Sequence, residues 1–249
     1  MLPSLAALAL QTDTNGKKTR DELERPDPRL LTTAVRQGDL ERVLDLLDHG
    51  ADVNKMDEDG NIPLVLASRE GHVDIVHVML AIFLAEVDKK DSKGNTALYV
   101  ASVHNHADVV KTLLAVGAEV DATDSNGAAV LQRAIRKGHT RVVQLLLDAD
   151  ANVDKVDSSG VTPLIEATYS GNATIVELLL YYDANIDKMD VYGDTALMLA
   201  CERDSEEIIK LLLKNGADPD IRDKNGKTAA DRAPSMESKN NINRLVRER

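Results

Sequence analysis

The side chains of this chain that could take part in metal binding or catalysis are six histidines, one cysteine and many carboxylates. His104 and His106 stand two positions apart on a predicted turn, but no third ligand stands nearby at the spacing that zinc sites use. Cys201 follows Ala200 on a predicted inward-facing helix, which favours a small buried side chain over a nucleophile. A single cysteine also excludes a disulfide within the chain and suits a reducing compartment.

The carboxylates recur too regularly for a catalytic pair. An Asp stands three positions before a Gly at six places, and these residues are Asp57, Asp91, Asp124, Asp157, Asp190 and Asp223. An Asp in this context bonds its own backbone, so the row is typical of a repeated turn. The chain has no Ser-His-Asp order, no phosphate-binding Gly loop, and no basic stretch interleaved with aromatic residues. We therefore expect no enzyme activity, no catalytic residue, and no bound cofactor or metal.

The element that positions these residues is a unit of one turn and two helices. Five turn glycines follow one another every 33 residues, and they are Gly94, Gly127, Gly160, Gly193 and Gly226. In residues 157–189, Asp-Ser-Ser-Gly predicts a turn, and Thr162-Pro163 predicts a helix start, because Thr caps free N–H groups and Pro suits the first helical position. Gly171 ends that helix, and a second helix carries apolar residues on one face. Neither helix can bury its apolar face alone, so the units must stack.

On these residues the chain resembles the ankyrin-repeat family, whose unit has a 33-residue period, a β-turn and two helices. The family's Thr-Pro-Leu motif and the segment that joins units are visible in Thr162-Pro163-Leu164, Thr96-Ala97-Leu98, Thr195-Ala196-Leu197 and Gly50-Ala51-Asp52-Val53-Asn54. The resemblance covers about nine-tenths of the chain. It implies an all-α solenoid of seven stacked helix-turn-helix repeats with projecting β-turn loops.

The expected domain is residues 24–249, in which the repeats span about 24–56, 57–90, 91–123, 124–156, 157–189, 190–222 and 223–249. Residues 1–23 are expected to form a mobile N-terminal tail. The alternative is that Leu5 and Leu8 dock on the first repeat or on another molecule.

Several repeats depart from the family pattern. Repeat two has no Gly to end its second helix, so we expect a remodelled connection covered by Phe83. Repeat four has Ala129 where others have Thr, which predicts an uncapped first helix. The His that usually follows Thr-Pro-Leu is replaced throughout, so packing should take over its role of joining adjacent loops. His72, His106 and His139 stand where the family often has a structural His.

Composition restricts the class of partner. The formal net charge is −12, which argues against a nucleic acid or an anionic membrane as the partner, and no apolar run is long enough to span a membrane. The resemblance implies a non-enzymatic protein-interaction module, an adaptor or scaffold in the cytoplasm or the nucleus, with no small-molecule substrate. The alternative function is a regulatory or targeting subunit of an enzyme complex.

Two residues predict an ion pair between repeats. Arg133 and Glu166 are 33 positions apart, and Leu and Val occupy the same place in other repeats. Two opposite charges in adjacent buried places are best explained by a direct pair that bridges repeats four and five. The alternative is that both side chains extend outward without pairing.

The resemblance implies a binding surface on the concave face, at the turn tips and the exposed ends of the first helices. There the later repeats carry apolar and Tyr side chains, with basic residues on the N-terminal side that suit an extended or acidic segment. The predicted contact residues are Ala128, Val161, Tyr169, Val191, Tyr192, Arg136, Lys137, Arg69 and Arg36. The alternative is a set of scattered exposed residues that bind nothing.

One residue resembles a modification site. Asn54 lies in Leu-Leu-Asp-His-Gly-Ala-Asp-Val-Asn, which is similar to the segment that asparaginyl hydroxylases modify in some ankyrin proteins. A turn residue that bonds its own backbone is the favoured interpretation.

Overall fold

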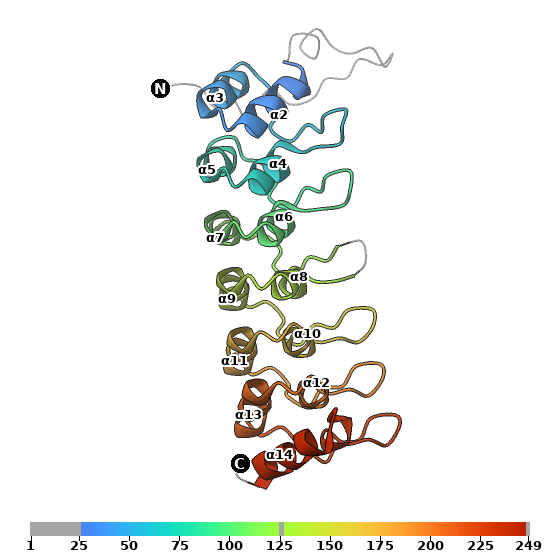
Figure 1. Ribbon diagram of the computed structural model, residues 1–249. Helices are drawn as coiled ribbons and strands as arrows, with labels where there is room; N and C mark the ends of the chain where they lie inside the picture. The colour runs from blue at the N-terminus through green and yellow to red at the C-terminus, as the bar shows by residue number, and fades with distance from the viewer. Residues whose placement is uncertain (1–25, 125–126, 248–249) are drawn as a thin grey trace.

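The computed structural model describes residues 26–124 and 127–247, which form seven repeats stacked along one axis (Figure 1). The first elements of the repeats are α2 (Pro28–Gln37), α4 (Pro63–Glu70), α6 (Ala97–Val103), α8 (Val130–Arg136), α10 (Pro163–Tyr169), α12 (Ala196–Glu202) and the 3-10 helix η2 (Ala230–Arg232). The second helices are α3 (Leu40–Asp48), α5 (Val73–Ala81), α7 (Ala107–Ala115), α9 (Thr140–Asp148), α11 (Ala173–Tyr181), α13 (Glu206–Lys214) and α14 (Met236–Arg247). The expected all-α solenoid is confirmed. The tail with Leu5 and Leu8 lies outside the described residues.

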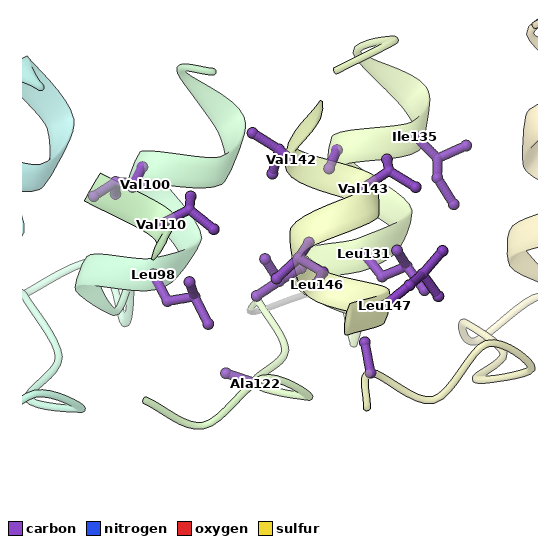
Figure 2. Packing of buried hydrophobic residues seen from close by; sticks show 14 of the residues in the cluster. Leu98, Val100, Val110, Ala122, Leu131, Ile135, Val142, Val143, Leu146 and Leu147 are labelled. Carbon is purple, nitrogen blue, oxygen red and sulfur yellow. The ribbon is translucent and has the colours of Figure 1, made fainter. Parts of the chain in front are cut away.

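First and second helices form two parallel layers, and the turns project from the layer of first helices (Figure 1). The core lies between the layers and between neighbouring repeats, and it is continuous from Leu31 to Leu245. Figure 2 shows this packing around repeats three and four, where Leu98, Val110 and Leu146 point into the space between helices. The core consists almost entirely of Leu, Val, Ile and Ala, as the scarcity of aromatic residues indicates. None of the described helices is long and apolar enough to cross a membrane.

Each turn is built around its Asp. Asp57 Oδ1 accepts hydrogen bonds from the backbone N–H groups of Asp59, at 3.0 Å, and of Asn61, at 2.8 Å. Gly60 closes the turn with a φ of 82°, a left-handed conformation that glycine adopts without strain. The same backbone hydrogen bonds recur around Asp91, Asp157, Asp190 and Asp223. The structural interpretation of the Asp row is therefore correct.

A second row of side chains joins each repeat to the next. Asn54 Oδ1 accepts from the backbone N–H of Glu86 at 2.8 Å, and Asp88 Oδ1 accepts from that of Glu119 at 3.0 Å. Equivalent bonds run from Asn152 to Asp121, from Asn185 to Asp154 and from Asp218 to Asp187. We call this row the inter-repeat ladder. It occupies Asn54 Oδ1 as a structural acceptor, but the donor is the backbone of the next repeat, so the interpretation of Asn54 as a turn residue that bonds its own backbone is wrong.

Hydrogen bonds therefore join adjacent repeats to a greater extent than expected, because we expected packing to take over this role. Gln132 stands where the family has His, and its Nε2 donates to the Val161 carbonyl at 2.8 Å in the next turn. His106 Nε2 lies 2.9 Å from the Arg69 carbonyl and His139 Nε2 lies 3.1 Å from the Val103 carbonyl, each in the preceding repeat. The structural interpretation holds for these two histidines.

The connection in repeat two is remodelled as expected. After α5 ends, the N–H of Ala85 bonds the Met79 carbonyl six residues back, whereas Ala118 in the next repeat bonds the carbonyl of Leu113, five residues back. Leu84 takes the left-handed place of the missing glycine, with a φ of 52°. Phe83 packs partly buried against the core.

The first helix of repeat four has a partial substitute for its missing cap. Ala129 offers no side-chain acceptor, but Gln132 Oε1 reaches back to the Ala129 N–H at 3.2 Å. The N–H of Val130 donates to the Ala122 carbonyl at 3.2 Å. The expectation of an uncapped start is therefore only partly correct.

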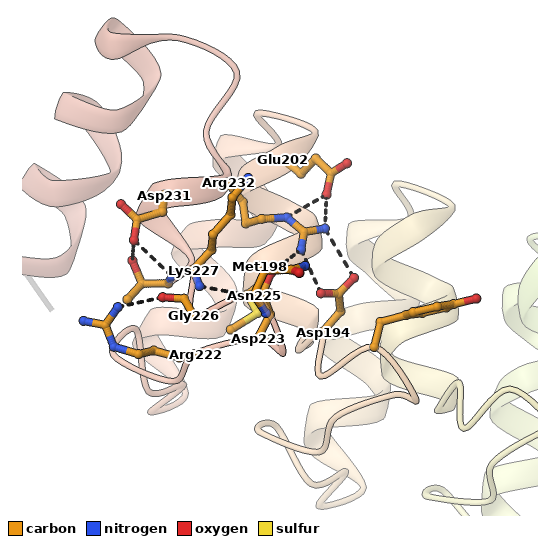
Figure 3. Close-up of polar contacts among 12 residues, drawn as sticks. Asp194, Met198, Glu202, Arg222, Asp223, Asn225, Gly226, Lys227, Asp231 and Arg232 are labelled. Atoms are coloured by element: carbon orange, nitrogen blue, oxygen red, sulfur yellow. Dashed lines mark hydrogen bonds and ion pairs between the residues drawn. The ribbon is translucent and has the colours of Figure 1, made fainter.

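The seventh repeat closes the stack with a polar cluster around Arg232. Its guanidinium donates to Asp194 and Asp223 at 2.8 Å each and to Glu202 at 2.5 Å, so it ties repeats six and seven together (Figure 3). The helix α14 covers the last core layer with Ile242 and Leu245.

Candidate functional site

A groove of about 700 Å³ opens on the face of the turns and first helices, across repeats four to six. The helices α8, α10 and α12 and their turns supply its walls. It is lined by Arg136, Val161, Ile165, Glu166, Tyr169, Ser170, Asp190, Leu199 and Arg203.

The floor of the groove contains an ion pair between α8 and α10. Arg136 donates to both oxygens of Glu166, from Nε at 2.9 Å and from Nη2 at 2.7 Å. The Glu166 side chain is 8% exposed and that of Arg136 is 48% exposed, so the carboxylate is buried beneath a guanidinium that faces water. The hydrogen bonds that Arg136 donates to Glu166 raise the pKa of Arg136 above its ordinary value.

The predicted pair between Arg133 and Glu166 is wrong. Arg133 instead pairs with Asp124 of its own turn, from Nε at 2.7 Å. Side chains on a helix lean toward its N-terminus, so Arg133 leans toward the turn that precedes α8. Arg136 lies almost one helical turn further along α8. The same tilt of the side chain toward the N-terminus of the helix places its guanidinium beside Glu166 on α10. The expected bridge between repeats four and five exists, but Arg136 makes it.

One wall of the groove is an aromatic ring with a guanidinium over it. Tyr169 is 57% exposed at the end of α10, and the guanidinium carbon of Arg203 lies 4.5 Å from the centre of its ring. Such a contact is attractive because the ring face carries partial negative charge. Arg203 directly follows α12 and is exposed to solvent.

The structure brings together some of the predicted contact residues. Arg136, Val161 and Tyr169 line the groove together. Val191 and Tyr192 are 45% and 67% exposed on the next turn, and they do not line it.

Other predicted contact residues are placed differently. Ala128 is only 6% exposed, because it belongs to the inward return of the turn and bonds Asp124 through its backbone, so its prediction as an exposed contact is wrong. Lys137 is exposed beside the groove. Arg69 and Arg36 lie two and three repeats away, and Arg69 pairs with Asp91 at 3.1 Å.

Sequence reasoning missed Arg203. It stands 34 residues after Tyr169, one repeat and one position further along, and that offset places a long side chain over the preceding repeat. The signal in the sequence is therefore an offset of 34 residues, one more than the 33-residue repeat.

The remaining candidates for chemistry are structural. Cys201 is fully buried, and burial raises the pKa of its thiol to about 12, so the nucleophilic thiolate does not form at neutral pH. In residues 26–124 and 127–247, no cluster of three His, Cys, Asp or Glu side chains could hold a metal ion.

This architecture matches known protein-family models and is similar to solved structures. A family model described as ankyrin repeats (3 copies) matches residues 31–124 and 115–190, and a single ankyrin-repeat model matches residues 192–224. No curated protein matches the chain by sequence. Among solved structures, the chain is similar to the ankyrin repeat domain of Bcl-3, a member of the IkappaB protein family, with 28% identity and a TM-score of 0.80 over 86% of this chain and 97% of that one. It is also similar to the human ASB11 ankyrin repeat domain, with 28% identity and a TM-score of 0.74 over 86% of this chain and 96% of that one.

Proposed function

The chain belongs to the ankyrin-repeat family, and from that premise we propose that it is a non-enzymatic adaptor or scaffold that binds a protein partner on the concave face formed by its turns and first helices. Ankyrin repeats are generally protein–protein interaction modules. Residues 24–249 are the binding domain in this proposal. The partner is a protein segment rather than a nucleic acid, because a net charge of −12 repels a polyanion.

The observation that carries the proposal is the groove of repeats four to six. It is lined by a half-exposed Tyr and by three aliphatic side chains, the partly buried Val161 and Leu199 and the buried Ile165, beside an ion pair that already satisfies its own buried carboxylate. A partner that binds there therefore gains apolar contacts, and its binding does not require the desolvation of an unpaired charge. Tyr adds a large contact area at a low cost in side-chain entropy, which is typical of the residues that dominate interfaces.

The proposal places the protein in the cytoplasm or the nucleus. Its single, buried cysteine forms no intrachain disulfide and suits a reducing compartment.

Affinity capture followed by mass spectrometry tests the proposal. We expect Tyr169→Ala combined with Tyr192→Ala to leave the fold intact and to weaken capture of the partner at least tenfold, or roughly 1.4 kcal/mol. The matched control is Tyr181→Ala, which removes an 80% exposed Tyr from α11 in the layer of second helices. Circular dichroism and thermal unfolding establish that each variant is folded.

Two outcomes of the capture carry further meaning. If the double variant captures every partner as well as the wild type does, the binding face lies elsewhere and the proposal fails. If one catalytic assembly is recovered in fixed stoichiometry, the chain is a regulatory or targeting subunit of an enzyme complex.

A further inference from the structure

One cation of the groove, Arg203, differs from Arg136, the other arginine of the groove lining. Arg69, Arg133 and Arg136 each pair with a carboxylate, and Arg232 holds three. Arg203 pairs with no carboxylate in residues 26–124 and 127–247, and its charge lies over the ring of Tyr169.

The contact with Tyr169 leaves Arg203 able to bind an anion. The guanidinium carbon lies 4.5 Å from the centre of the Tyr169 ring, and the ring carries no negative charge that would neutralise the cation. The N–H groups of a guanidinium form a planar fork that matches a carboxylate, and the contact with the ring restricts the freedom of the side chain before a ligand arrives.

An apolar surface lies beside this cation. Val161, Ile165 and Leu199 line the same groove as the Arg136–Glu166 pair and Arg203. A ligand that fits both features carries an apolar side chain for these three residues and a negative charge for Arg203.

The whole molecule limits how much negative charge the ligand can carry. The chain has a net charge of −12, so a strongly acidic tract is repelled at long range. One or two carboxylates suit Arg203, the arginine of the groove lining that pairs with no carboxylate of the described residues.

We propose that the groove binds an extended protein segment in which one or two Asp or Glu residues lie close to an aliphatic or aromatic residue, with the carboxylate on Arg203 and the apolar side chain on Val161, Ile165 and Leu199. This inference rests on the proposed function. It moves the acidic contact to the C-terminal side of Tyr169, whereas the sequence favoured the side of Arg136, Arg69 and Arg36. The change follows because Arg136 and Arg69 already bind carboxylates of the chain itself.

A random 12-residue peptide library displayed on phage tests the proposal directly. Such a peptide spans about 40 Å when extended, which is enough to cross three repeats. The library is selected in parallel on the full wild-type chain, on Arg203→Glu, on Tyr169→Ala, and on Lys111→Glu as a control that reverses an exposed charge on α7.

We expect the wild type and Lys111→Glu to enrich peptides with Asp or Glu near an aliphatic or aromatic residue. Selection on Arg203→Glu should replace the acidic residue with Lys or Arg and keep the apolar one. Arg203→Gln should weaken binding of a synthesised wild-type peptide about tenfold or more, because a charged partner of the carboxylate is lost.

Several results would overturn the inference. If peptides depend on Tyr169 but show no acidic preference, or if Arg203→Glu leaves the preference unchanged, the assignment to Arg203 is wrong while the proposed function stands. If the enriched peptides bind Tyr169→Ala as well as they bind the wild type, the groove is not the binding face, and the inference and the proposed function both fail. If no peptide is enriched, the groove does not bind short extended segments and the inference is wrong, while the capture experiment still decides the proposed function.

Discussion

For arginines on the first helices, the direction in which the side chain points along the helix determines which carboxylate it pairs with. Arg133 reaches the Asp of its own turn, and Arg136, three residues later, reaches Glu166 on the next helix. The Glu166 carboxylate is buried and the Arg136 guanidinium is half-exposed, so this pair falls between an exposed pair and a buried one.

A double-mutant cycle measures that pair. With Arg136→Leu and Glu166→Leu we expect a coupling of about 1–2 kcal/mol in the free energy of unfolding, measured by urea denaturation. The matched control is the cycle of Arg133→Leu with Glu166→Leu, which should be additive because these side chains bind different partners. A larger coupling in the control cycle would reverse the assignment.

The turn carboxylates give the fold a dependence on pH. Burial opposes the charge of Asp57, but hydrogen bonds from the Asn61 backbone and side chain, the Thr32 hydroxyl and the Asp59 backbone outweigh it and hold the pKa of Asp57 below its ordinary value. The pKa of an unfolded Asp is about 3.9, so this stabilisation is present above that pH and is lost as the pH falls through the lower pKa of the folded state.

We therefore expect the wild type to lose unfolding free energy as the pH falls below about 4. Asp57→Asn should be less stable by about 1 kcal/mol at pH 7 and should lose less on acidification. The control is Asp59→Asn, which changes an exposed carboxylate on the same turn. Urea midpoints at pH 7 and pH 3 decide, and equal acid sensitivity of Asp57→Asn and the wild type would contradict the prediction.

At the scale of single elements, the end of α5 is the strained place. Leu84 holds a φ of 52° where Gly50, Gly117 and Asp150 hold the same left-handed conformation in other repeats. A non-Gly side chain there costs about 1–2 kcal/mol, and Leu84 regains little because it is 77% exposed.

Leu84→Asn should stabilise the chain by about 0.5–1 kcal/mol, because Asn tolerates this conformation and no buried contact is lost. The control is Ile82→Asn, which removes a similarly exposed side chain at a φ of −107° and should give no gain. Thermal unfolding of both variants measures the difference, and a gain from Ile82→Asn equal to that from Leu84→Asn would show that lost exposed apolar area is the cause.

At the scale of the whole molecule, the architecture could be predicted and the pairing of side chains could not. Turn geometry depends on a few local residues, such as Asp57 and Gly60, so a repeated pattern of them predicts seven stacked units. The partner of Arg133 and the contact of Arg203 with Tyr169 depend on how far a side chain reaches along and across helices. Residues at the same position of two repeats share a backbone environment, but this alone does not bring their side chains into contact.

The inter-repeat ladder has a consequence for how the protein is made. Its bonds join residues only 31 or 32 positions apart, as from Glu119 to Asp88 or from Glu86 to Asn54. A ribosome adds about 5–20 residues per second, so a 33-residue repeat takes about 2–7 s to emerge, whereas a helix forms in about a microsecond. Each ladder acceptor is therefore synthesised before its donor, and once the first repeats have stacked the chain can fold in the order of its synthesis.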